Sequence, residues 1–125
     1  METPAELSYS TNHEWVRAAG GGSVIIGITD FAQQSLGDVL FINLCGAGEK
    51  FVKGEPIGDV ESIKSVSEII CPVSGTVAKI NEKVLENPGL INSDPYGAWL
   101  AEIASVTDLN GLISAGEYEA FIAVQ

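Results

Sequence analysis

Lys64 is the residue whose position in this chain most clearly predicts chemistry. Two strand-like runs, Ile57–Ile63 and Val66–Ile70, flank the pair Lys64-Ser65, which predicts a tight hairpin with the lysine at its tip. The pair contains no Gly or Asn, so the sequence does not specify the turn type. A primary amine on a rigid two-stranded mount can be joined to a carboxylic acid as an amide, and would then carry a covalent arm. The residues alone also fit a solvated turn lysine without a function.

A weak internal repeat places this lysine near the middle of two similar halves. Gly37–Asn43 and Gly75–Asn81 share a Gly-x-Val start and an Ile-Asn end, at an offset of 38 residues (75 − 37). Glu55-Pro56 and Asp94-Pro95 repeat at an offset of 39 (94 − 55). Two copies of one strand-turn-strand unit would leave such an echo. We therefore expect residues 1–125 to form a single domain whose two quasi-repeated halves meet near Lys64.

The expected elements are mostly short strands. Runs of β-branched residues predict strands at Ser23–Ile28, Val39–Leu44, Thr76–Asn81 and Trp99–Ile103. Val39–Leu44 is apolar on both faces, so we expect it to be buried. Many short strands separated by turn signals, with helices gathered at the ends, predict a mainly β fold, either a small sandwich or a flattened barrel.

Helix signals occur after the first strands and at the C-terminal end. Over residues 29–37, Asp30 can cap a helix, Gln33 can answer it and Gly37 can close it. A short helix is also predicted over residues 107–113. Ser114 and Glu117 have capping-box spacing, and an apolar stripe follows that should pack against the β core: Tyr118, Phe121 and Ile122. The C-terminal helical segment is thus expected over about residues 107–124.

Charge excludes several classes of partner. Six Lys and Arg stand against seventeen Asp and Glu, for a net charge of −11. Such a chain cannot neutralise a run of phosphates, so we expect neither nucleic-acid binding nor attachment to an anionic membrane. The acidic surface favours proteins with basic docking faces. No apolar run is long enough to span a bilayer, and residues 1–6 lack the features of a signal or transit peptide.

The cysteines and the single histidine give no pattern that predicts catalysis or metal binding. Cys45 and Cys71 lie 26 residues apart (71 − 45) without a C-x-x-C spacing, which predicts free, reduced thiols. Because reduced thiols are typical of the cytoplasm, we expect a cytoplasmic protein. His13 is the single histidine and has no convincing nucleophile beside it in the sequence, so we interpret it as structural. With one histidine and two scattered thiols, a metal site is not expected. No catalytic residue is assigned.

Four segments of the chain resemble the H proteins of the glycine cleavage system. Glu61-Ser62-Ile63-Lys64 followed by Ser67-Glu68 closely resembles the lipoyl-lysine motif of that family. The other three resemble its N-terminal signature, its helix segment and its second half, over Tyr9–Val16, Gly27–Asp38 and Pro72–Trp99. The resemblance extends over roughly residues 7–122. It implies a sandwich/barrel hybrid of the biotinyl/lipoyl-carrier type.

The resemblance also implies a function. Lipoic acid would be joined to Lys64 as an amide by a lipoate ligase or lipoyl transferase, and the chain would be a non-catalytic carrier, expected to be a monomer. The arm would collect an aminomethyl group from glycine decarboxylase and deliver it to an aminomethyltransferase. Dihydrolipoamide dehydrogenase would then reoxidise the dithiol, since thiol–disulfide exchange is reversible at each station. Tethering gives the arm a high effective concentration at each partner.

In the family the loaded arm folds into a cleft on its own protein. The positions here that match the cleft are Asn12, Glu14, Ser35 and Glu68. A carboxylate at position 14 or 68 could hold the ammonium of the arm by a charge-assisted hydrogen bond, although each could instead be a solvated surface charge. Ser35 and Asn12 depart from the family, in which position 35 is often histidine and position 12 often a small hydroxyl residue.

Three alternatives remain from the sequence. A biotin carrier could share the fold, but biotinyl lysines usually lie between methionines, whereas Ile63 and Ser65 flank this lysine. A cysteine-dependent hydrolase would use Cys71 and His13, and no spacing supports it. A structural or regulatory relative that exchanges no aminomethyl groups is the third.

Overall fold

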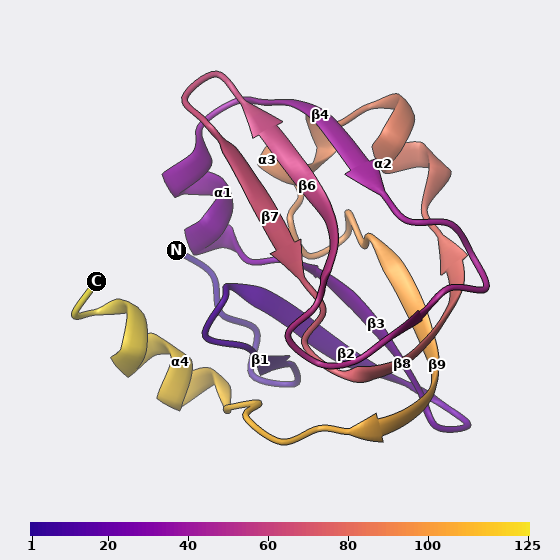
Figure 1. Cartoon of the computed structure of the whole chain (residues 1–125). Helices are drawn as coiled ribbons and strands as arrows, with labels where there is room; N and C mark the ends of the chain where they lie inside the picture. The colour runs from indigo at the N-terminus through magenta and orange to yellow at the C-terminus, as the bar shows by residue number, and fades with distance from the viewer.

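The chain folds into two antiparallel sheets with four short helices. The computed structural model describes all of residues 1–125. One sheet has six strands in the order β1-β2-β3-β9-β8-β5, and the other has three in the order β4-β6-β7 (Figure 1). The strands are β1 Ser8–Tyr9, β2 Glu14–Gly20, β3 Ser23–Ile28, β4 Val39–Leu44, β5 Lys50–Phe51, β6 Pro56–Ser62, β7 Val66–Ile70, β8 Ser74–Ile80 and β9 Ala101–Asp108. The helices are α1 Asp30–Leu36, α2 Glu82–Glu86, α3 Leu90–Ser93 and α4 Ala115–Ile122. The predicted mainly β fold is confirmed.

The main core fills the space between the two sheets. Strand alternation turns Ile26, Val77 and Ile103 of the larger sheet inward, where they are almost fully buried. Val60 and Ile69 of the smaller sheet belong to the same apolar cluster. Facing sheets with interdigitating side chains are the usual way for a β-sandwich to bury apolar surface. This packing gives β6 and β7 a rigid base.

A second apolar cluster attaches α4 to the outside of the larger sheet. Ser114 and Glu117 form the predicted capping box. Tyr118 is fully buried and stacks on Tyr9 with ring centroids 4.6 Å apart, and Trp15 belongs to the same cluster. The predicted packing of the α4 stripe against the β core is therefore confirmed.

Helix α1 connects β3 of the larger sheet to β4 of the smaller sheet. Its N-cap is Thr29, whose hydroxyl accepts the N–H of Ala32, and not Asp30 as predicted. Asp30 is the first helical residue, and its carboxylate accepts a hydrogen bond from the Gln33 amide at 2.7 Å. Gly37 ends the helix as predicted, with φ 75° and ψ −158°, a combination essentially restricted to glycine.

Three further predictions from the sequence were wrong. The helix predicted over residues 107–113 does not form, because β9 continues to Asp108 to pair with β8, and α4 begins only at Ala115. Strand β4 is not buried on both faces, since it lies at the edge of the smaller sheet with Leu40 and Phe41 exposed. The sequence also predicted no helix over residues 82–93, where α2 and α3 form. None of the four helices has the length and apolarity that a bilayer crossing needs.

A glycine on β3 allows β2 and β3 to pair around a buried indole. Gly27 is the register partner of Trp15, and a Cβ at position 27 would overlap the Trp15 ring. We expect Gly27→Ala to lower the free energy of unfolding by about 1–3 kcal/mol, as overpacking does in a dense core. Urea unfolding measures this loss.

Gly116→Ala is the matched control, because position 116 lies in α4 with open space where the methyl group would go. Alanine is the better helix former, so this change should leave stability equal or raise it slightly. Equal losses in the two variants would contradict the overlap with Trp15.

Candidate functional site

The lysine loop joins β6 to β7 at an exposed end of the smaller sheet. Strand β6 ends at Ser62 and β7 begins at Val66, so residues 63–65 form the loop (Figure 1). The predicted hairpin with Lys64 at its tip is present, but its link is one residue longer than the predicted Lys64-Ser65 pair. The Ser62 hydroxyl accepts the backbone N–H groups of Lys64 and Ser65, each at 3.2 Å, and the Ser62 N–H donates to the Ser65 carbonyl at 2.8 Å. A serine side chain thus closes this turn without Gly or Asn. The Lys64 side chain is exposed.

The loop is fastened to the junction between α1 and β4. The Ile63 N–H donates to the Asp38 carbonyl at 3.1 Å. The stem of Lys64 lies over Gly37, where an added Cβ would be 3.3 Å from Cε of the lysine. A glycine at position 37 therefore serves both the backbone conformation and the approach of the lysine stem.

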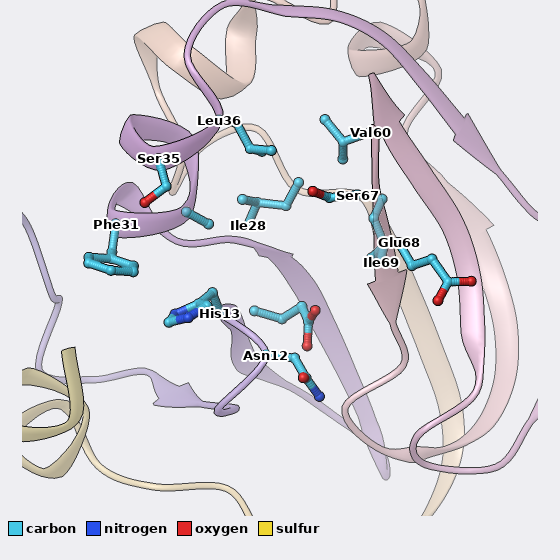
Figure 2. Close-up of a pocket in the computed structure, with 12 residues that line it drawn as sticks. Asn12, His13, Ile28, Phe31, Ser35, Leu36, Val60, Ser67, Glu68 and Ile69 are labelled. Carbon is cyan, nitrogen blue, oxygen red and sulfur yellow. The ribbon is translucent and has the colours of Figure 1, made fainter. Parts of the chain in front are cut away.

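A half-open pocket of about 220 Å³ begins next to this junction. Leu36, which precedes Gly37, is one of its walls. Figure 2 shows the pocket between α1, β7 and the turn before β2. The complete lining is Asn12, His13, Glu14, Ile28, Phe31, Ala32, Ser35, Leu36, Val60, Ser67, Glu68 and Ile69. All four cleft candidates from the sequence are among these residues, while Lys64 lies outside the pocket, close to its Leu36 wall.

Glu14 is the buried acid of this pocket. Its side chain is only 3% exposed, and the Ser10 hydroxyl donates to its Oε1 at 2.6 Å. Burial raises the pKa of Glu14 to about 8, although the hydrogen bonds from Ser10 and from the Ile70 backbone act in the opposite direction. The interpretation of Glu14 as a solvated surface charge is therefore wrong. A largely neutral carboxyl that ionises when a cation arrives is suited to receiving an ammonium group.

The other three candidates lie on the rim. Ser35 is exposed on α1, and Asn12 is exposed at the tip of the turn, with its amide directed away from the pocket (Figure 2). Glu68 is exposed, and its carboxylate points outward from β7 (Figure 2). Its register partner on β6 is Asp59. For Glu68 the solvated interpretation describes its position well.

Ser67 was missed by the sequence interpretation and faces the pocket. Its hydroxyl points between β7 and Ile28 (Figure 2). Alternation along a strand places Ser67 on the same face as the buried Ile69, two residues later. That pattern was available in the sequence and would have selected position 67 over position 68.

His13 forms part of the pocket floor and has structural partners. Its backbone adopts φ 68°, which lets residues 10–14 turn tightly. Its Nδ1 lies 2.8 Å from the Tyr118 hydroxyl, which lies 2.8 Å from the Thr29 hydroxyl. Burial lowers the pKa of His13, which favours the neutral imidazole. The histidine thus ties the pocket floor to α4 and to the start of α1.

The cysteines do not form a catalytic pair with His13. Cys71 is fully buried and its thiol donates to the Val73 carbonyl at 3.0 Å. Burial raises the pKa of both Cys71 and Cys45, which opposes the thiolate that a nucleophile or redox centre needs. Both thiols are free. The hydrolase alternative therefore has no support.

The arrangement defines a class of protein. Two antiparallel sheets with a lysine at an exposed hairpin tip are the architecture of carrier domains of the biotinyl/lipoyl type. The family model described as glycine cleavage H-protein matches residues 7–125. The chain therefore belongs to the glycine cleavage H-protein family.

Individual relatives agree along nearly the whole chain. A glycine cleavage system H protein of Herpetosiphon aurantiacus is 51% identical over 120 residues, which cover 95% of this chain and 92% of the relative. One from Lachnoclostridium phytofermentans is 44% identical and covers 98% of this chain and 96% of the relative. The crystal structure of a glycine cleavage system H protein from Mycobacterium marinum has a TM-score of 0.90 at 38% identity, covering 96% of this chain and 98% of that one. The predicted fold type and family are confirmed.

Burial of Glu14 predicts a pH-dependent stability difference. The pKa of Glu14 is about 8 in the folded chain against an ordinary 4.5, so the unfolded chain loses this proton first as pH rises. Glu14 therefore weakens folding by roughly 1.4 kcal/mol per pH unit between those values. We expect Glu14→Gln to exceed the unfolding free energy of the parent chain by less than about 1 kcal/mol at pH 5 and by more than about 2 kcal/mol at pH 8. Urea unfolding at both pH values measures the difference.

Both the parent chain and Glu14→Gln retain His13, so the titration of this histidine contributes equally to both and does not affect the difference in unfolding free energy. Glu68→Gln, at an exposed carboxyl, is the control and should not reproduce the effect. A Glu14→Gln difference that is the same at pH 5 and pH 8 would show that Glu14 is ionised in the folded chain.

Proposed function

We propose that Lys64 carries lipoic acid as an amide and that the loaded arm docks in the pocket beside α1. The observation that carries this proposal is the position of the lysine stem over Gly37, one residue from the pocket wall at Leu36. The amine is exposed to an attaching enzyme, whereas its base is fixed by the Ile63–Asp38 hydrogen bond. An arm that starts there begins beside the pocket.

The chain is a non-catalytic carrier of the glycine cleavage system, as the members of its family are. The lipoyl arm takes the aminomethyl group of glycine from glycine decarboxylase and presents it to an aminomethyltransferase. The dithiol that remains passes its electrons to dihydrolipoamide dehydrogenase. A lipoate ligase or lipoyl transferase forms the amide, and this removes the positive charge of Lys64.

Glu14 gives the pocket its preference for the loaded arm. An aminomethyl group on a lipoyl sulfur ends in an ammonium, and the Glu14 carboxylate is the buried anion that can pair with it. The arriving cation lowers the pKa of Glu14, which then releases its proton. The apolar walls Ile28, Val60 and Leu36 accommodate the hydrocarbon part of the arm and limit access of water.

The remaining surface suits transient docking in the cytoplasm. The net charge of −11 favours partners with basic faces around their active-site entrances. We propose that residues 1–125 act as one monomeric carrier domain. The repeated segments lie on β4 and β8, one in each sheet, with the lysine loop between them in the sequence.

Replacing the lysine tests the attachment site. When the chain is produced with a lipoate ligase and lipoate, intact mass should show one lipoyl addition, and Lys64→Arg should abolish it, because guanidinium cannot form this amide under ligase conditions. Lys79→Arg is the control, since Lys79 is also an exposed lysine but lies within strand β8 and not at a hairpin tip. A lipoyl addition that persists in Lys64→Arg would refute the assignment.

Loading the arm tests the docking site. Treatment of the lipoylated, oxidised chain with methylamine and the decarboxylase reduces the lipoyl disulfide as the aminomethyl thioether forms. This loading should shift backbone amide resonances of Glu14, Ser67 and Glu68, which surround the pocket. Phe41, exposed at the edge strand β4 outside the pocket, should keep its resonance. Unchanged resonances at Glu14 and Ser67 would dismiss the pocket as the dock.

A further inference from the structure

Asn92 of α3 forms hydrogen bonds with three groups at the base of the lysine loop. Its Oδ1 accepts the Val39 backbone N–H at 2.8 Å. Its Nδ2 donates to the Gly37 carbonyl at 2.9 Å and to Oε1 of Gln33 at 3.0 Å. The partners lie more than fifty residues earlier in the chain. This single amide therefore connects α3, α1 and β4.

The two backbone bonds bracket Asp38. Gly37 precedes it and Val39 follows it, and the carbonyl of Asp38 itself accepts the Ile63 N–H. Fixing both neighbours fixes the direction in which this carbonyl points. The stem of Lys64 lies over Gly37, the same residue whose carbonyl Asn92 holds.

The third bond reaches the pocket wall. Gln33 lies on α1 between Phe31 and Ser35, which both line the pocket. Asn92 thus holds the pocket helix and the anchor of the lysine loop with one rigid planar group. Its donors and acceptor are matched to two oxygens and one N–H, which no carboxylate of the same shape could satisfy.

We propose that Asn92 is a positioning residue that sets the placement of the Lys64 loop relative to the pocket. The proposal deepens the function given above and rests on it, because it concerns how the arm is presented. Asn92 touches neither the amine nor the arm. It acts through Gly37, Asp38 and Ile63, so its loss should loosen the loop more than the sheet behind it.

Amide hydrogen exchange in the unmodified chain tests the proposal without a lipoyl group. In Asn92→Asp a carboxylate faces the Gly37 carbonyl and Oε1 of Gln33, and repulsion replaces two hydrogen bonds. The Ile63 amide should then exchange about tenfold faster, whereas the Cys45 amide, bonded to the Ile57 carbonyl in the same sheet, should change little.

Asn81→Asp is the matched control. Asn81 also bridges backbone groups, donating to the Trp99 carbonyl and accepting the Lys83 N–H, but none of its partners belongs to the lysine loop or α1. This variant should not accelerate the Ile63 amide more than the Cys45 amide. Equal acceleration of both amides in Asn92→Asp, or none at Ile63, would overturn the proposal.

Gln33→Ala provides a second variant if Asn92→Asp does not fold. It removes one of the three bonds and lies on a half-exposed helix face, so the Ile63 amide should accelerate by less than in Asn92→Asp but more than the Cys45 amide. An Ile63 amide that Gln33→Ala leaves unchanged would count against the proposal.

Attachment kinetics connect the loop to function. We expect the rate of lipoylation by a lipoate ligase to fall about threefold or more in Asn92→Asp, and to remain near the parent rate in Asn81→Asp. Parental rates in both variants would overturn the claim that Asn92 acts on presentation of the lysine. A parent chain that gains no lipoyl group would instead refute the proposed function, and the exchange result at Ile63 would still decide whether Asn92 positions the loop.

Discussion

The backbone hydrogen bond from the Ile63 N–H to the carbonyl of Asp38 fixes where the lysine loop lies relative to α1 and the pocket. Without this bond the hairpin tip would contact only solvent and would be mobile. An arm attached to a mobile tip could reach many surfaces of the protein besides the pocket. The bond joins the tip to the end of α1, and α1 forms a wall of the pocket. The mobility of the arm is therefore confined to the lysine side chain and the group attached to it.

The pocket next to the lysine loop contains a buried carboxyl, Glu14, whose burial lowers the free energy of unfolding at neutral pH. Glu14 lies between the sheets with Ser10 as its side-chain partner, and its ionisation at neutral pH is opposed by burial. In the proposed function the cation that reaches this carboxyl is the ammonium of the loaded arm. The proposal therefore gives Glu14 two states, a protonated carboxyl in the empty carrier and a carboxylate paired with the loaded arm.

Much of this arrangement could be predicted from local sequence. Alternation located β6 and β7 and left Lys64 between them, and capping chemistry located α4 from Ser114 and Glu117. The failures have tertiary causes. Pairing with β8 extends β9 over residues with helix-like signals, and the edge position of β4 exposes Leu40 and Phe41. The burial of Glu14 and the three bonds of Asn92 depend on partners distant in the sequence or in another sheet, so no local pattern could reveal them.

The central claim is that the group on Lys64 and the pocket beside α1 are made to meet. The most direct measurement is the set of nuclear Overhauser contacts between the methylene protons next to the sulfurs of a methylamine-loaded lipoyl group on Lys64 and the methyl group of Ala32, which lines the pocket. The structure predicts clear contacts to Ala32 and none to the Phe41 ring, which lies outside the pocket. A loaded arm that contacts only solvent, or that contacts Phe41 and not Ala32, would contradict the account.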